Sequence, residues 1–114
     1  MLPPANRLRK EKEIKRALAS RNARKNGPLA CKTAANDLAA ARFCFVVSKR
    51  ISNKAAVRNK LKRRLRAAVA ALLDQARPGV DCVLIAHSGL EAKTYAEIAL
   101  IVKKVLMMAG ILDN

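Results

Sequence analysis

The clearest alternation of apolar and polar positions lies in residues 42–48, which read R-F-C-F-V-V-S. Aromatic and β-branched side chains in such a segment predict a β-strand, whose successive side chains point to opposite faces. One face is expected to carry Phe43, Phe45 and Val47, and the other Cys44, Val46 and Ser48.

Two further segments are expected to be strands. The short apolar run at residues 82–86 suits a buried strand. Leu29–Ala35 predicts a weaker strand, because it is rich in alanine, and the Asn26-Gly27-Pro28 sequence before it is typical of a turn.

Apolar residues spaced by three or four positions predict a long helix over residues 55–75, ended by Pro78-Gly79. Its apolar stripe consists of Val57, Leu61, Leu65, Ala68 and Leu72. A shorter helix is expected over residues 8–20, with Asn6 as its N-cap. One side of this helix would hold Leu8, Ile14 and Leu18.

A third helix is expected to begin at Thr94, because Thr94 and Glu97 have the spacing of a capping box, and to end near Gly110. The apolar face expected for it carries Tyr95, Ile98, Val102, Val105 and Leu106.

The order of elements, helix, strands, helix, strand, helix, predicts the α+β class. We expect a single α/β sandwich, with three helices packed on one small mixed sheet, and one domain over residues 1–114. Hydrophobic residues make up 52% of the chain, which is enough for a core, but aromatic residues only 3%. The core must therefore be built mainly from Ala, Leu, Val and Ile.

Charge is distributed very unevenly along the chain. The 24 basic and 8 acidic residues give a formal net charge of +16. Residues 1–66 hold 20 of the basic and three of the acidic residues. Such an asymmetry favours a polyanionic partner such as a nucleic acid.

Cysteine usage and hydropathy point to a soluble protein of the cytoplasm. The odd number and wide spacing of Cys31, Cys44 and Cys82 fit reduced thiols, and no apolar run is long enough for a signal peptide or a membrane span. These cysteines have no zinc-site spacing with His87, which we expect to be a structural or RNA-facing residue.

No nuclease motif of a protein enzyme is visible. The acidic residues form no close D-x-D or D-x-E set, and the chain has neither a P-loop nor a G-x-G-x-x-G motif. We therefore expect no catalytic residue and no metal site in this chain.

Residues 49–66 carry the strongest functional signal. Nine of these 18 residues are Lys or Arg and none is acidic. On a helix Arg58, Lys62 and Arg66 form one row, in which like charges four residues apart repel one another. Such a row is typical of a surface that faces phosphate groups, which arginine can bind in a bidentate manner.

Residues 43–66 resemble the signature of the protein subunit of bacterial ribonuclease P, a strand ending in V-S-K-K and a helix with A-V-x-R-N-R-x-K-R-x-x-R. Here they read F-C-F-V-V-S-K-R-I-S-N-K-A-A-V-R-N-K-L-K-R-R-L-R. A looser likeness covers N-R-L-R-K-E-K-E-I near the start and L-E-A-K-T-Y-A-E-I near the last helix.

The resemblance implies an RNA-binding subunit of a ribonucleoprotein that removes the 5′ leader from precursor tRNA. In that family the RNA subunit carries catalysis with bound magnesium, so the protein would bind no cofactor itself. The implied partners are the catalytic RNA and precursor tRNA, with no membrane and no required protein partner. A left-handed crossover from strand to basic helix to strand is also implied, against the general right-handed rule.

The resemblance also implies two sets of site residues. Those matching the motif that docks on the catalytic RNA are Arg58, Asn59, Lys60, Lys62, Arg63, Arg66 and Lys54. A cleft for the leader, between the first helix and the sheet, would involve Arg9, Lys12, Ile14, Lys15, Arg16, Leu18, Phe43, Phe45, Ser48 and Lys49.

The chain departs from the family pattern at three of these positions. Lys60 stands where the motif has its second arginine, which keeps the charge but loses the planar fork. Ile14 and Leu18 replace aromatic residues of the first helix, and aliphatic side chains cannot stack on a leader base. Phe43 and Phe45 remain as stacking candidates, with a role in the core as the alternative.

Two other function classes share the charge and the pattern of elements. A non-enzymatic ribosomal or RNA-chaperone protein would lack the V-S-K-R…R-N-K-x-K-R-x-x-R string. A DNA-binding helix-turn-helix protein would need two helices joined by a tight turn, whereas a strand and a basic loop precede residue 55 here.

Overall fold

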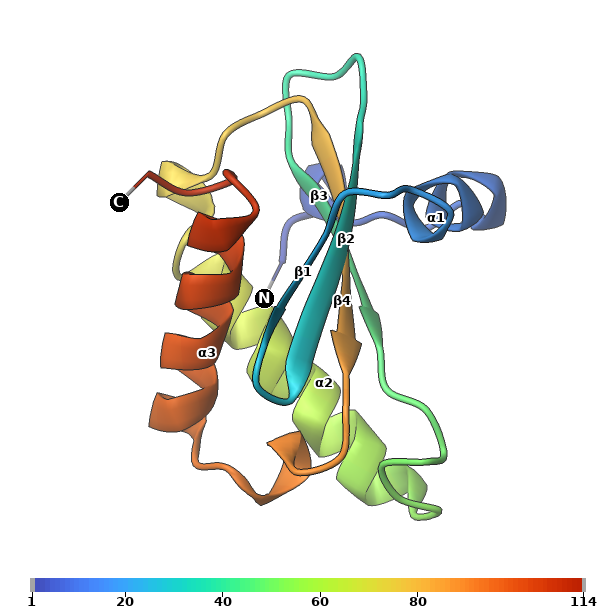
Figure 1. The fold of residues 1–114 in the computed structure, drawn as a ribbon, viewed down its shortest axis with the longest axis vertical. Coiled ribbons are helices and arrows are strands. Elements are labelled where there is room, and N and C mark those ends of the chain that lie inside the picture. The colour runs from blue at the N-terminus through green and yellow to red at the C-terminus, as the bar shows by residue number, and fades with distance from the viewer. Residues whose placement is uncertain (1, 114) are drawn as a thin grey trace.

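Four strands form one mixed sheet in the order β1-β2-β4-β3 in the computed structural model, which describes residues 2–113 (Figure 1). The strands are β1 (Ala23–Asn26), β2 (Leu29–Ala35), β3 (Arg42–Val46) and β4 (Val80–Ala86). The helices are α1 (Glu11–Leu18), α2 (Ala55–Ala70) and α3 (Tyr95–Met108), with short 3₁₀ helices at Pro4–Asn6, Leu73–Gln75 and Leu90–Ala92.

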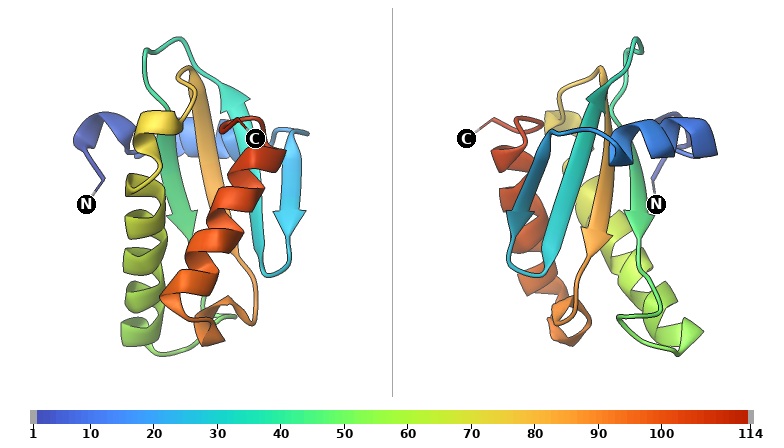
Figure 2. Two further views of the ribbon diagram at one scale, coloured as in Figure 1. Left: turned by 90° about the vertical axis from the view of Figure 1, so that its left-hand side faces the viewer. Right: turned by 45° about the vertical axis from the view of Figure 1, so that its right-hand side comes forward.

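The helix α2 connects two strands that are neighbours and parallel. β3 pairs with β4 in register Phe43↔Cys82, while β4 pairs antiparallel with β2, and β2 with β1. The left view of Figure 2 has α2 in front of the sheet. There β3 runs down, α2 returns upward, and β4 runs down to the right of β3, which is a left-handed crossover.

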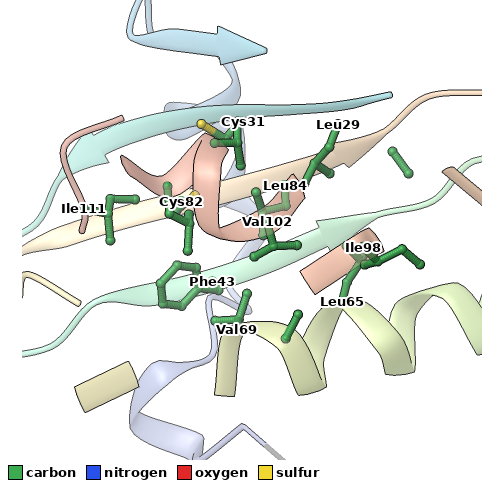
Figure 3. Packing of buried hydrophobic residues seen from close by; sticks show 14 of the residues in the cluster. Leu29, Cys31, Phe43, Leu65, Val69, Cys82, Leu84, Ile98, Val102 and Ile111 are labelled. Carbon is green, nitrogen blue, oxygen red and sulfur yellow. The ribbon is translucent and has the colours of Figure 1, made fainter. Parts of the chain in front are cut away.

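The larger core lies between the sheet and the pair α2 and α3 (Figure 3). Phe43 is its one fully buried aromatic side chain among residues 2–113, at 2% exposure. Around it lie Leu, Val, Ile, Ala and Cys side chains, as expected from the composition. α3 begins with the predicted capping box, in which Thr94 Oγ1 accepts from Glu97 N and Glu97 Oε1 accepts from Thr94 N.

The helix α1 packs on the opposite face of the sheet and covers only part of it (Figure 1). Ala17 is fully buried there beside Leu8 and Val83, whereas Ile14 and Leu18 are half-buried. This smaller core leaves much of the α1 face of the sheet open to a ligand.

Local predictions and the structure differ near the N-terminus. The helix expected over residues 8–20 begins only at Glu11, because the segment before it pairs with β3: Leu8 N donates to Phe43 O at 2.9 Å. Asn6 is not the N-cap, and its Nδ2 instead donates to Ala41 O at 2.9 Å. The strand β1 was not predicted, and its four residues pair with β2 across the Gly27-Pro28 turn, where Gly27 adopts a φ of 57°.

The other two helices also differ from expectation in one detail each. The α-helix expected to reach Gln75 ends at Ala70 and gives way to a 3₁₀ turn, which turns Leu72 and Leu73 onto the core. Tyr95 was expected on the buried face of α3, but this first residue of the helix is 42% exposed.

Candidate RNA interface

A basic row on α2 lies beside the edge strand β3. The apolar positions Leu61, Leu65 and Ala68 are buried against the sheet and so determine which side of the helix faces out. Arg66 is exposed, and its Cζ lies 6.0 Å from the centroid of the Phe45 ring, a cation–π arrangement. Arg58 and Lys62 are half-buried and continue the same row toward the start of the helix.

The loop between β3 and α2 is held by its own serines and by the basic row. Ser48 Oγ accepts from Arg50 N at 3.3 Å, and Ser52 Oγ accepts from Lys54 N at 3.1 Å. Arg58 Nη1 donates to Ser52 O at 2.9 Å, so Arg58 has a structural contact in addition to its exposed donors. The lysines of this loop, Lys49 and Lys54, are exposed.

Among the remaining residues of the basic motif, three are exposed to solvent and one forms a hydrogen bond within the protein. Asn59, Lys60 and Arg63 are exposed. Arg64, which was not assigned to the RNA-docking set, donates from Nη1 to Lys93 O at 3.1 Å and ties α2 to the segment before α3.

A groove of about 460 Å³ joins the N-terminal segment, β3 and α2. Three arginines, Arg7, Arg9 and Arg66, line it together with Phe43, Cys44, Phe45, Leu2 and Leu8. Because no carboxylate of the described residues, 2–113, lines its walls, the groove presents guanidinium groups over an apolar floor.

A second open surface is the α1 face of the sheet. Ile14 and Leu18 of α1 look onto a surface shared with Cys44, Val46 and Ile85, all half-buried. It continues into a hollow of about 570 Å³ at the ends of β3 and β4, lined by Val46, Ile85, Ser48, Arg50, Ile51, Ala86, His87 and Ser88. An apolar floor with basic residues at its margin suits a single-stranded nucleic acid.

The helix α1 is attached to the sheet by an ion-pair network. Arg42 Nε and Nη2 donate to Asp81 Oδ1 and Oδ2, both at 2.8 Å. Arg42 Nη1 and Nη2 also donate to Glu13 Oε1 and Oε2 of α1, at 3.2 and 3.0 Å. Hydrogen bonds to Asp81 and to Glu13 raise the pKa of Arg42, which therefore stays charged.

The residues expected in the leader cleft do not all reach one surface. Phe43 and Phe45 pack with the core on the α2 and α3 side of the sheet, away from α1. Phe43 is buried there, and Phe45 is half-buried and lines the groove of Arg7, Arg9 and Arg66. Ile14, Leu18 and Ser48 border the α1 face.

The charged residues expected in that cleft also lie in different places. Arg9 lines the groove with the two phenylalanines, and Lys12 and Lys49 are exposed. Lys15 pairs with Glu11 at 3.1 Å. Arg16 Nη2 donates to Ala35 O at 2.7 Å and lies 3.8 Å from Asp81 Oδ2.

Residues that the sequence analysis did not assign to a site include Arg7, Cys44, Val46 and Ile85. For Cys44 and Val46 the alternation along β3 was the available signal, because it placed them opposite the phenylalanines. The pairing of Arg7 with Phe43 had no comparable signal, since an isolated bridge leaves no periodicity.

The three cysteines are free thiols in different surroundings. Burial raises the pKa of Cys44, and the nearby charges of Lys62 and Arg66 partly oppose this effect. A hydrogen bond between Cys31 and Cys82 lowers the pKa of Cys31 and raises that of the fully buried Cys82. Within residues 2–113 no group of three His, Cys, Asp or Glu side chains is placed to hold a metal ion.

A model of one protein family, Ribonuclease P, matches residues 2–110. The chain belongs to the ribonuclease P protein family. It is similar to the ribonuclease P protein component of Roseiflexus castenholzii, with 34% identity over 111 residues, 96% of this chain and 90% of the relative. The protein component of Gluconacetobacter diazotrophicus is 35% identical over 114 residues and 97% of each chain.

Solved structures of ribonuclease P proteins share the fold. The Staphylococcus aureus protein superimposes with a TM-score of 0.87 at 24% identity, covering 96% of this chain and 99% of that chain. The protein from Thermotoga maritima gives a TM-score of 0.81 at 22% identity and covers 90% of this chain and 96% of that chain. The α+β class with three helices and a mixed sheet is therefore confirmed.

The role of the chain is that of an RNA-binding ribonuclease P protein subunit in tRNA processing. The alternative of a ribosomal or chaperone-type protein is not favoured. None of the helices in residues 2–113 has the length and apolar character that crossing a bilayer requires.

Proposed function

We propose that the chain docks on the catalytic RNA of ribonuclease P through the basic row of α2. The observation that carries this proposal is that Arg58, Lys62 and Arg66 form no ion pair within residues 2–113. The ion pairs formed within residues 2–113 all involve residues of α1, Arg42 or Asp81. A row of like charges without carboxylate partners is favourable only when an anion neutralises it.

The 5′ leader of precursor tRNA would then bind the α1 face of the sheet. Ile14, Leu18, Val46 and Ile85 supply apolar contact there, and Ser48 with its neighbouring basic loop supplies polar contact at one end. The groove lined by Arg7, Arg9 and Arg66 leads around the β3 edge to the docking row, so both RNAs would lie against one continuous basic surface.

In this proposal hydrolysis of the phosphodiester bond, with its magnesium, belongs to the RNA subunit in the cytoplasm. The protein subunit contributes positive charge that lowers the repulsion between the catalytic RNA and its anionic substrate. Because it also binds the leader, it raises the affinity for the precursor relative to mature tRNA, which lacks the leader.

Docking is tested by a triple variant, R58A/K62A/R66A, against a control with the same charge loss at exposed positions, R21A/K103A/K104A. The binding constant K falls as the salt concentration rises, and each lost phosphate contact makes the slope of log K against log salt shallower by about 0.7–0.9. The triple variant should therefore bind the catalytic RNA more weakly, with a salt slope reduced by about 2 to 3. Equal slopes for the triple variant and the control would show that α2 is not the docking surface.

A further inference from the structure

A polar pocket of about 350 Å³ lies where β1 begins and β2 ends. Asn22 and Arg24 line it from the β1 side, Thr33 from β2, and Arg77 from the connection between α2 and β4. Ala109 and Ile111, at the end of α3, complete the wall. We call it the Arg24–Arg77 pocket. The start of β1, the end of β2 and the C-terminal end of α3 lie together at the top of the left view of Figure 2.

Among residues 2–113, the polar side chains of the Arg24–Arg77 pocket have one hydrogen bond and no ion pair. Arg24 donates from Nη1 only to the carbonyl oxygen of its neighbour Ala23, at 2.9 Å. Within residues 2–113, no hydrogen bond or ion pair involves the guanidinium of Arg77, the side-chain amide of Asn22 or the hydroxyl of Thr33. No carboxylate of residues 2–113 lines the pocket.

Backbone hydrogen bonds fix the main chain at two of the residues that line the pocket, while Asn22, Arg24 and Arg77 are exposed. Arg77 N donates to Ile111 O at 2.8 Å, and Thr33 N donates to Asn22 O at 3.0 Å. Gly110 has a φ of 76°, and a Cβ added there would lie 3.2 Å from Arg77 Nη2, so the glycine leaves room for the guanidinium. Arg77 is an exposed residue whose guanidinium thus lies beside the end of α3.

We propose that the Arg24–Arg77 pocket binds a phosphate group. Two guanidinium forks, an amide and a hydroxyl supply hydrogen-bond donors from three sides, and phosphate oxygens are the acceptors that such forks match. Placing two unpaired guanidinium groups on one pocket costs Coulomb repulsion, which a bound anion removes. The polar residues of the pocket belong neither to the docking row nor to the α1 face, although Ala34 and Ala35 at its wall also contact the α1 side. Its phosphate would come either from an RNA backbone or from the free ion.

The test follows backbone amide NMR signals of the ¹⁵N-labelled full chain during titration with inorganic phosphate, and in a parallel arm with a short single-stranded RNA. Saturable shifts are expected at Asn22, Thr33, Arg77 and Gly110. If the RNA produces these shifts and displaces phosphate, the source is an RNA phosphodiester. If only the free ion produces them, the pocket is a site for inorganic phosphate.

Two variants and a matched control separate this site from diffuse electrostatics. R24Q/R77Q should weaken phosphate binding about tenfold or more, since hydrogen bonds to charged groups contribute strongly. K103Q/K104Q removes the same charge from exposed positions of α3 and should leave the shifts unchanged.

T33V keeps charge and shape while removing the hydroxyl, and should weaken binding several-fold. It therefore tests the site even if R24Q/R77Q proves unstable. Equal affinity in R24Q/R77Q and K103Q/K104Q, or wild-type binding in T33V, would overturn the assignment. Because R58A/K62A/R66A should retain these shifts, a failure of the docking proposal would not affect this result.

Discussion

Replacing Arg42 with methionine should strongly destabilise the protein, because it removes the cation from a buried network. The side chain of Arg42 is 14% exposed and that of Asp81 is 0% exposed. Methionine preserves the aliphatic stem but leaves the Asp81 carboxylate with Asn36 Nδ2, at 2.7 Å, and the more distant Arg16, at 3.8 Å. A buried charge would thus lose its two shortest charged contacts.

The size of the effect follows from the burial of Asp81. Removing one partner of a buried pair costs about 3–5 kcal/mol, because the remaining charge is uncompensated. A domain of this size has a total stability of about 5–15 kcal/mol, so R42M would lose a large part of it. The double variant R42M/D81N removes the stranded charge, and we expect it to be more stable than R42M alone.

The assay is urea denaturation of wild type, R42M, D81N and R42M/D81N at one fixed sulfate concentration, completed as a double-mutant cycle. R50M is the control, since Arg50 is exposed, and it should change the free energy of unfolding by less than about 0.5 kcal/mol. Hydrogen exchange should show loss of protection in α1 before α2, because only Ala17 of α1 is fully buried.

Two results would refute this reasoning. One is a cost of R42M no larger than that of R50M, which would mean that solvent already screens Asp81. The other is additivity, in which D81N destabilises R42M as much as it destabilises the wild type. Additivity would show that Arg42 and Asp81 contribute independently rather than as a pair.

Three further predictions concern folding, leader contact and capping. With a net charge of +16, the protein should gain helical circular dichroism between low salt and tens of millimolar sulfate, because anions stabilise the native state; an unchanged spectrum would contradict this. I14F/L18F should raise the ratio of precursor to mature tRNA affinity in the reconstituted enzyme, because each newly stacked base adds up to about 1–3 kcal/mol of binding free energy. An unchanged ratio would mean that these positions do not contact the leader. T94A should lower the free energy of unfolding by about 0.5–2 kcal/mol, whereas T94S should retain the cap. Equal loss in T94A and T94S would show that the hydroxyl is not responsible.

The features that the sequence predicted correctly have signals that lie within a few neighbouring residues. β2 has the predicted bounds, and the capping box of α3 is present with both of its hydrogen bonds. The two faces of β3 are also as predicted, with Phe43 toward the larger core and Cys44 toward the smaller one. Periodicity and capping are local, so each can be identified without knowledge of the rest of the chain.

The basic row could also be predicted from the sequence, because residues spaced by four positions lie on one side of a helix, here beside the apolar stripe. By contrast, alternation along a strand separates two faces but does not say which helix covers which face. Phe43 and Phe45 could therefore be named as leader candidates, although α1 lies on the other side of the sheet.

Only the tertiary structure decided the contacts between distant residues. Arg42 and Asp81 are 39 residues apart and meet because β3 and β4 pair in parallel across a left-handed crossover. Leu8 leaves the predicted helix because its backbone bonds to Phe43, and Arg24 and Arg77 share a pocket only through the packing of α3. These contacts depend on the order and hand of the strands, which no local pattern of side chains encodes.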